Sequence, residues 1–253
     1  MAGHSKWANI KHRKQAQDSK RGKQFAKLIR KIESAAREAS TSDPEASPSL
    51  AMAVQNAKDA DVPKDTIDRA CKRGAGELDD GTSYEQTQYE GYAPGGVAVL
   101  VDCLTDNRNR TAADVRNAFT KVGGSLAEPG AVAFMFSRRG QIVVEANGQS
   151  EDDLMVAGLD AGLEDIEAAG DSLIAWCEAT DVQHLRAALQ AADFKVTESG
   201  APFVASTTVP VADVGEARKV LRLLDLLDDN DDVQDVYANF DIDDEVLAQL
   251  DEE

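Results

Sequence analysis

Apolar residues recur at helical spacing in the first third of the chain. Asp18 or Ser19 can cap a helix, and at about 100° per residue six apolar residues beyond them fall on one stripe: Phe25, Leu28, Ile29, Ile32, Ala36 and Ala39. Two further apolar patterns start at Ser47-Pro48 and Val62-Pro63, and the second of them ends at Lys72-Arg73-Gly74, a basic last turn followed by a glycine stop. The spacing predicts a basic tail and a three-helix domain over residues 1–81.

After Tyr84 the spacing of apolar residues changes from that of helices to that of strands. Residues 87–92 and 97–104 predict a hairpin around the turn Ala93-Pro94-Gly95-Gly96. Thr111 can cap a following helix that stops at Gly123-Gly124, and the apolar run at residues 131–136 predicts a strand. The resulting order, β-β-α-β, does not close a domain by itself.

A second series has the order β-α-β-β-α-β, which is that of the ferredoxin-like fold. Its elements are expected at residues 141–146, 150–162, 165–168, 173–178, 181–192 and 195–199. An extended segment, a helix and a strand then follow at residues 207–211, 213–227 and 233–240. We expect this last helix and strand to complete the open first series.

The predicted fold class is therefore α+β multidomain, with an N-terminal three-helix domain followed by two ferredoxin-like α/β domains, one inserted into the other. Residues 138–205 form the inserted domain, and residues 82–137 plus 206–241 form the discontinuous one. Residues 242–253 are expected to be an acidic tail that forms no more than a fraying, solvated turn.

Charge is segregated sharply along the chain. Residues 1–40 hold eleven of the twenty-seven Lys and Arg but only three acids, a net of +8, whereas the remaining 213 residues carry a net of −27. A cationic segment on an acidic protein is the electrostatic footprint of a local contact with nucleic acid, because the acidic body repels polyanions. The alternative is an ordinary solvated face, but such a face normally mixes both signs to form i,i+4 pairs.

Candidate nucleic-acid-binding residues follow from this segregation. Lysine and arginine would contact phosphate, Trp7 and His4 would stack or hydrogen-bond, and Arg108 and Arg110 would form a second anchor at a helix N-terminus, where backbone N–H groups favour an anion. The full set is His4, Lys6, Trp7, Lys11, His12, Arg13, Lys14, Lys20, Arg21, Lys23, Lys27, Arg30, Lys31, Arg108 and Arg110. Two alternatives stay open: Trp7 packs inside the helical domain, and the loop arginines pair with neighbouring carboxylates.

Other chemistry is absent from the sequence. There is no nucleophile elbow, Walker loop, H-E-x-x-H or dinucleotide fingerprint, and Cys71, Cys103 and Cys177 lack the spacing of a metal or redox site. No apolar run approaches the length of a membrane span, and the N-terminus lacks the apolar region of a secretory signal. We expect a cytoplasmic, monomeric, non-enzymatic protein with reduced cysteines and no cofactor, metal, membrane contact or small-molecule substrate.

Four stretches of the sequence resemble the YebC/PmpR family, whose eukaryotic members include the mitochondrial translational activator of cytochrome c oxidase. They are MAGHSKWANIKHRK, VPKDTIDRACKRGAGEL, YEGYAPGGVAVLVDCLTDNRNRT and AEPGAVAFMF. The resemblance implies the same fold, an N-terminal helical domain followed by two ferredoxin-like domains with one inserted. For function it implies either a DNA-binding transcriptional regulator or a ribosome-associated translation factor that relieves stalling, notably at proline runs.

The basic N-terminal residues favour one of these two functions over the other. A basic tail with one stackable aromatic suits irregular RNA or a ribosomal cleft, whereas site-specific DNA reading needs a recognition helix with base-reading side chains. The basic helix is dominated by lysine, which makes point-charge contacts to phosphate. We therefore place ribosomal RNA and the ribosome first and DNA second. The acidity of the rest of the chain departs from the family and argues against non-specific DNA binding by the α/β domains.

Overall fold

The computed structural model describes residues 18–78 and 84–251, which fall into two compact units. One unit combines the helical segment up to residue 78 with residues 138–203, and the other combines residues 84–137 with residues 204–251. Where the chain passes from one unit into the other and back, β4 (Phe136–Arg138) pairs with β9 (Phe203–Ala205).

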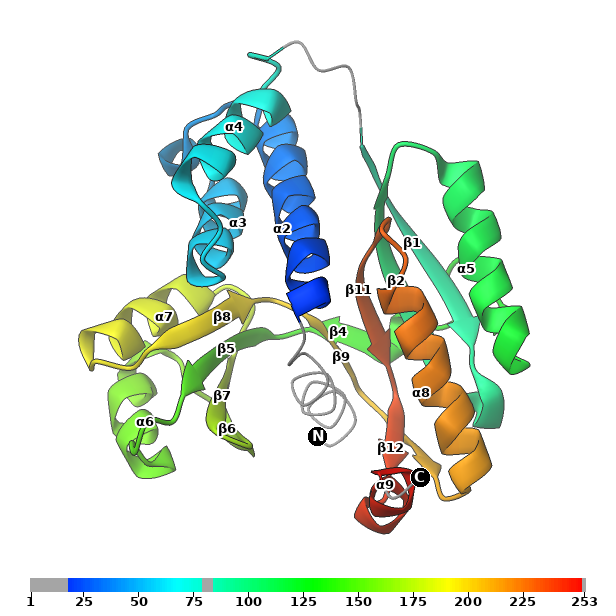
Figure 1. Cartoon of the computed structure of the whole chain (residues 1–253). Helices are drawn as coiled ribbons and strands as arrows, with labels where there is room; N and C mark the ends of the chain where they lie inside the picture. The colour runs from blue at the N-terminus through cyan, green and yellow to red at the C-terminus, as the bar shows by residue number, and fades with distance from the viewer. Residues whose placement is uncertain (1–17, 79–83, 252–253) are drawn as a thin grey trace. The chain divides into compact units, whose positions relative to one another are not determined.

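The helical segment contains the three predicted helices, which share one core (Figure 1). They are α2 (Asp18–Ala39), α3 (Pro48–Asp59) and α4 (Lys64–Gly74), with a short 3-10 turn η1 (Pro44–Ala46) before α3. The Ser47 hydroxyl accepts the Leu50 N–H at 3.4 Å, so Ser47 caps α3 as predicted. Ile32, Ala36 and Leu50 are fully buried between the helices.

Gly74 does not play the role of the predicted helix stop. It is the last residue of α4, and an added Cβ would lie 2.4 Å from the Glu33 carbonyl oxygen and 2.7 Å from the Ala36 Cβ. Gly74 therefore lets α4 approach α2 closely. The stop itself lies at Gly76, whose φ of +77° lets the Glu77 N–H reach back to the Lys72 carbonyl at 2.9 Å.

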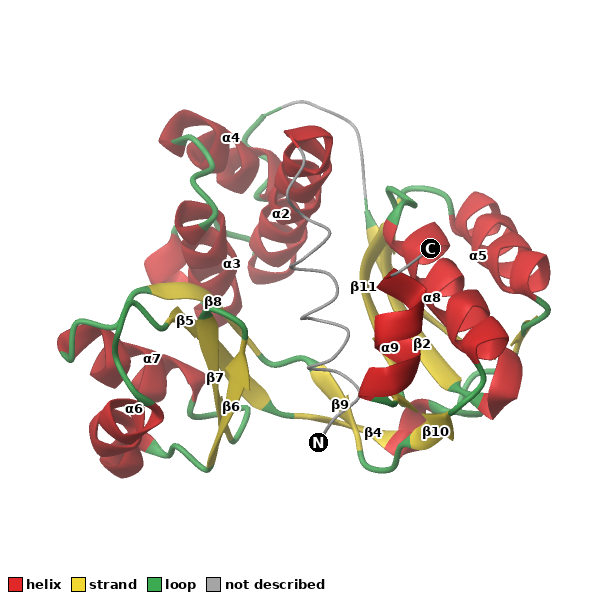
Figure 2. Ribbon diagram, turned by 60° about the horizontal axis from the view of Figure 1, so that its bottom comes forward, coloured by secondary structure: helices red, strands yellow, loops and turns green. Residues whose placement is uncertain are grey.

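Residues 138–203 form the predicted β-α-β-β-α-β domain. Its elements are β5 (Gly140–Glu145), α6 (Glu151–Gly158), η4 (Leu159–Ala161), β6 (Asp165–Ala169), β7 (Ser172–Cys177), α7 (Val182–Ala191) and β8 (Val196–Gly200). The strand order is β6-β7-β5-β8, with antiparallel neighbours throughout, as in a ferredoxin-like sheet. A capping box at Ser150 and Asp153 starts α6, which lies beside α7 (Figure 2).

The other unit has a second four-stranded sheet, of order β11-β2-β1-β3, with α5 and α8 packed against it (Figure 1). Its elements are β1 (Glu85–Tyr92), η2 (Pro94–Gly96), β2 (Ala98–Thr105), α5 (Arg108–Val122), β3 (Ser125–Leu126), α8 (Val214–Asp228) and β11 (Val233–Ala238). The late elements α8 and β11 complete the sheet that the first strands leave open, as predicted. Beside it, β10 (Val209–Val211) pairs in parallel with β12 (Phe240–Ile242).

The strand predicted at residues 131–136 is wrong. This stretch is a loop with a 3-10 turn, η3 (Ala133–Met135), and only Phe136 joins a strand. The reason is the buried Glu90 carboxylate, which accepts the N–H groups of Gly130, Val132 and Ala133 at 2.6, 2.6 and 2.8 Å. Burial alone would raise the pKa of Glu90, but these three hydrogen bonds outweigh it and the pKa lies below its ordinary value.

The C-terminal prediction is also wrong. Instead of a solvated turn, the chain forms α9 (Asp244–Asp251). Val246 is 7% exposed in the core of this unit, and Leu247 and Leu250 pack against the same core. Residues three and four apart share one side of a helix, so these apolar residues are sufficient to hold α9 against α8.

Candidate nucleic-acid interface

The cationic side of α2 is the part of the predicted interface that the structure describes most fully. We use this name for Lys23, Lys27, Arg30 and Lys31, which lie on the side of the helix opposite Ile32 and Ala36. Lys23 is exposed, whereas the other three are half-buried, and all four already interact with other groups of the protein. Three of the four side chains on the cationic side of α2 are therefore partly shielded from solvent. Lys20 and Arg21 belong to the first turn of the same helix.

An internal ion pair orients α2. Glu33 is buried, and its carboxylate lies 2.7 Å from the Arg73 guanidinium of α4. With Gly74 allowing close contact between the backbones, this pair sets the rotation of α2 about its own axis. The apolar stripe then faces α3 and α4, and the lysines are left on the other side.

A second polar cluster fixes the helical segment to the sheet of the inserted domain. We call Asn56, Asp59, Arg186 and Ser199 the Arg186 cluster. Arg186, on α7, is 3% exposed and donates to the Ser199 hydroxyl at 2.6 Å and to the Asp59 carboxylate at 2.7 Å. The Asn56 side chain donates to the Ser199 carbonyl at 2.8 Å. Helix α3 thus covers β8, the edge strand of that sheet, and satisfies one of its backbone groups.

The predicted second anchor lies at the start of α5, but Thr111 does not cap that helix. The cap is Asn107, whose side-chain oxygen accepts the Arg110 N–H at 3.1 Å. Thr111 is buried in the first turn, and its hydroxyl donates to the Asp232 carboxylate at 2.8 Å. The helix therefore begins four residues earlier than predicted.

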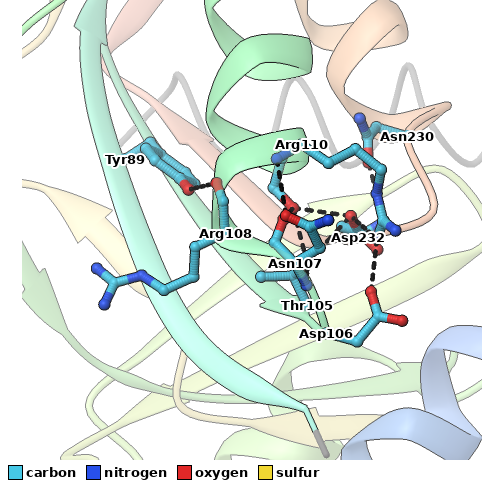
Figure 3. Close-up of polar contacts among 9 residues, drawn as sticks. Tyr89, Thr105, Asp106, Asn107, Arg108, Arg110, Asn230 and Asp232 are labelled. Carbon is cyan, nitrogen blue, oxygen red and sulfur yellow. Dashed lines mark hydrogen bonds and ion pairs between the residues drawn. The ribbon is translucent and has the colours of Figure 1, made fainter. Parts of the chain in front are cut away.

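The two arginines of this anchor differ in their surroundings (Figure 3). Arg110 lies 2.7 Å from Asp232 and 2.8 Å from Asp106, which is the carboxylate pairing that the sequence left open as an alternative. Arg108 is exposed, and its side chain points away from Asp232 (Figure 3). A phosphate at this site would meet Arg108 directly, whereas Arg110 would have to leave two carboxylates.

The buried Asp232 predicts an acid-sensitive contact. Burial alone would raise the pKa of Asp232, but hydrogen bonds from Arg110 and Thr111 and the charge of Arg110 outweigh it and lower the pKa. Because the pKa of Asp232 is lower in the folded chain than in the unfolded chain, ionised Asp232 stabilises the fold at every pH above its unfolded-state pKa of about 4. This stabilisation is lost as the pH falls through the folded-state pKa. Asp232→Asn should cost about 1–3 kcal/mol at pH 7, and its free energy of unfolding should fall less steeply below pH 5 than that of the parent.

Urea unfolding at pH 7 and at pH 3 to 5 measures both effects. Asp106→Asn is the matched control, because Asp106 pairs with the same arginine from an exposed position and its loss should cost less than about 0.5 kcal/mol. Equal costs for the two variants would contradict the assignment.

The remaining predicted residues lie outside the described part of the chain: His4, Lys6, Trp7, Lys11, His12, Arg13 and Lys14. Within residues 18–78 and 84–251, no cluster of His, Cys, Asp and Glu is arranged to hold a metal ion. No described helix is both long and apolar enough to span a bilayer. All three cysteines are buried and unbridged, and burial, with the nearby Asp181 and Glu164, raises the pKa of Cys177 to about 11.

Comparison with known proteins places these features in a family. The model of the TACO1/YebC protein N-terminal domain matches residues 5–77, and the model of the TACO1/YebC second and third domain matches residues 84–240. A relative from Beutenbergia cavernae is 57% identical over 254 residues and one from Mycolicibacterium smegmatis is 54% identical over 253, each over 100% of both chains. Both are named "Probable transcriptional regulatory protein", the name of a regulator and not of an enzyme.

A solved structure agrees with the fold. The crystal structure of a conserved hypothetical protein from Aquifex aeolicus superposes with a TM-score of 0.84 at 41% sequence identity, covering 91% of this chain and 94% of that one. The helical segment and both sheets thus recur in a relative. With full-length relatives above half identity and family models over nearly the whole sequence, the chain belongs to the TACO1/YebC family.

Proposed function

We propose that the protein is a nucleic-acid-binding regulator of gene expression, acting as a ribosome-associated translation factor that relieves stalling. The observation that carries this proposal is the cationic side of α2, held in a fixed orientation on an otherwise acidic protein. Its lysines would contact ribosomal RNA phosphates together with the basic residues that precede the helix. The acidic remainder confines the contact to this end of the chain.

The helical segment favours backbone contacts over base reading. Helix α3 directs Asn56 and Asp59 into the Arg186 cluster, so these two polar side chains are engaged within the protein and not turned outward to read bases. On the exposed side of α4, Asp65 and Asp68 stand among the basic residues and would repel phosphate. Helix α2 is long and cationic, but its lysines lack the bidentate geometry that distinguishes bases.

A DNA-binding transcriptional regulator is the second candidate. The printed names of the full-length relatives support it, since both are called transcriptional regulatory proteins. A regulator that contacted mainly phosphate would also use the cationic side of α2. The two candidates therefore share a surface and differ in the polymer that it binds.

Co-sedimentation with ribosomes on a sucrose gradient tests the choice. We expect the intact chain to travel with ribosomes at low salt and Lys23→Glu/Lys31→Glu to remain at the top. Arg116→Glu/Lys121→Glu, which makes the same charge change on the exposed side of α5, is the control and should sediment like the parent. If the intact chain stays at the top but retards duplex DNA in a gel, the DNA-binding candidate replaces the ribosomal one.

A further inference from the structure

Helix α6 carries apolar side chains both on the side that faces the core and on a side that faces solvent. Leu154 and Gly158 are buried in the core of the inserted domain. On the other side, Met155, Val156 and Leu159 are 40%, 83% and 63% exposed. Leu159, the first residue of η4, lies four residues after Met155 and three after Val156, so its side chain joins the other two into one stripe. We call them the α6 stripe.

The stripe is a cluster and not a scatter of single residues. Of the five large hydrophobic side chains that are exposed in the described part of the chain, three belong to it, and Leu78 and Phe134 lie elsewhere in the sequence. Single exposed apolar residues are normal on protein surfaces, whereas a contiguous group marks an interaction site.

The surroundings of the stripe are uniformly acidic. Residues 140–185 contain eleven Asp and Glu and neither Lys nor Arg. Glu151, Asp152 and Asp160 border the stripe directly and are exposed. Nucleic acid and anionic lipid surfaces are therefore repelled here. A symmetric pairing with a second copy through this patch is disfavoured too, because it would bring two acidic rims together.

We infer that the α6 stripe docks a basic amphipathic helix of a partner protein. The apolar side of such a helix would cover Met155, Val156 and Leu159, and its lysines or arginines would meet the acidic rim. The inference does not rest on the proposed function, since it concerns a different surface and the opposite charge. It gives the acidic inserted domain a role of its own, which is contact with a cationic protein segment.

The test uses a fluorescein-labelled amphipathic peptide of leucine and lysine and the intact chain, with binding read by anisotropy at near-physiological salt. The peptide should bind, and replacing its lysines by glutamate should weaken binding at least tenfold. Val156→Ser/Leu159→Ser keeps every charge of the rim and should also weaken binding at least tenfold. Phe134→Ser, the matched removal of an exposed apolar side chain elsewhere, should leave the affinity unchanged.

A second variant guards against a folding artefact. Asp152→Lys/Asp160→Lys changes only exposed side chains and should shift the preference toward the glutamate peptide. Equal binding of the lysine peptide by the parent and by Val156→Ser/Leu159→Ser would overturn the inference, since charge alone would then explain the attraction. A concentration-dependent dimer in sedimentation velocity that Val156→Ser/Leu159→Ser abolishes would overturn it as well, because a second copy would be the occupant.

Discussion

Replacing Arg186 by alanine should destabilise its unit by about 3–5 kcal/mol, the usual cost of removing one partner from a buried ion pair. Arg186 and Asp59 are both nearly inaccessible, with side chains 4% and 10% exposed and 2.7 Å apart. Without the guanidinium, the Asp59 carboxylate keeps one hydrogen bond, from Gln55, and the Ser199 hydroxyl loses a donor. An uncompensated charge would then remain between α3 and β8.

Urea unfolding followed by tryptophan fluorescence measures this cost. The chain has two tryptophans, and Trp176 is buried in the same unit as Arg186, so a Trp7→Phe background reports that unit alone. Arg116→Ala removes an exposed arginine of α5 and is the control, with an expected change within about 0.5 kcal/mol. An Arg186→Ala midpoint equal to that of the control would show that the cluster contributes nothing.

A double variant distinguishes the interaction energy of the Asp59–Arg186 pair from the cost of losing either residue alone. Asp59→Leu/Arg186→Leu removes both charges, so no buried ion is left unpaired, and it should lose less than the sum of the two single changes. Hydrogen exchange should also rise in α3 and β8 of Arg186→Ala. That pattern would identify the cluster as the contact that holds the helical segment, and with it the cationic side of α2, on the inserted sheet.

The elements that the sequence predicted well depend on local pattern. The helices α2, α3 and α4, the four strands of the inserted sheet, and β1, β2 and β11 lie within a few residues of their expected positions, because periods of 3.6 and 2 can be read from neighbouring residues. The short strand β3 was not predicted. Caps with a nearby partner, such as Ser47 on α3, were also predictable. The order of the strands in the inserted domain followed from the sequence of elements alone.

The errors arise where a distant residue decides the local structure. The run at residues 131–136 is apolar enough for a strand. However, backbone N–H groups in and next to this run donate hydrogen bonds to the Glu90 carboxylate, about forty residues earlier, and not to a neighbouring strand. Thr111 is a good cap by type, but its hydroxyl bonds Asp232, 121 residues away. No rule of spacing connects such pairs.

The candidate interface shows the same division. Charge segregation along the chain is a local property and pointed to α2 at once. Whether a given cation is already paired depends on tertiary contacts, so the carboxylate partners of Arg110 could not be predicted. The role of Arg186 was not predicted either. It lies near Leu185 and Leu189 on the buried side of α7, and no pattern in the sequence indicates that Asp59 is its partner.

Binding to RNA should weaken on the order of 10³-fold or more between 50 and 200 mM salt, provided that six or more cationic side chains contact phosphate. Each contact releases condensed counterions, so the logarithm of the affinity falls linearly with the logarithm of the salt concentration. The cationic side of α2 supplies four of these side chains, and Lys20 and Arg21 lie in the preceding turn. Anisotropy with a labelled ribosomal RNA fragment, repeated across a salt series, measures the slope, and a flat dependence would contradict an electrostatic interface.

Single substitutions then test whether the lysines of α2 account for the salt dependence of binding. Lys23→Ala, Lys27→Ala and Lys31→Ala should each reduce its magnitude, by about 0.7 on a single strand and about 0.9 on duplex DNA, and the triple variant should bind on the order of 10²-fold more weakly at 100 mM salt. Lys121→Ala, on the exposed side of α5, removes one charge elsewhere and should leave the slope unchanged. Equal slopes for the triple variant and the parent would place the contact outside α2. Because the reduction per lysine differs between single strands and duplexes, the same titrations also indicate whether the bound region is single-stranded or duplex.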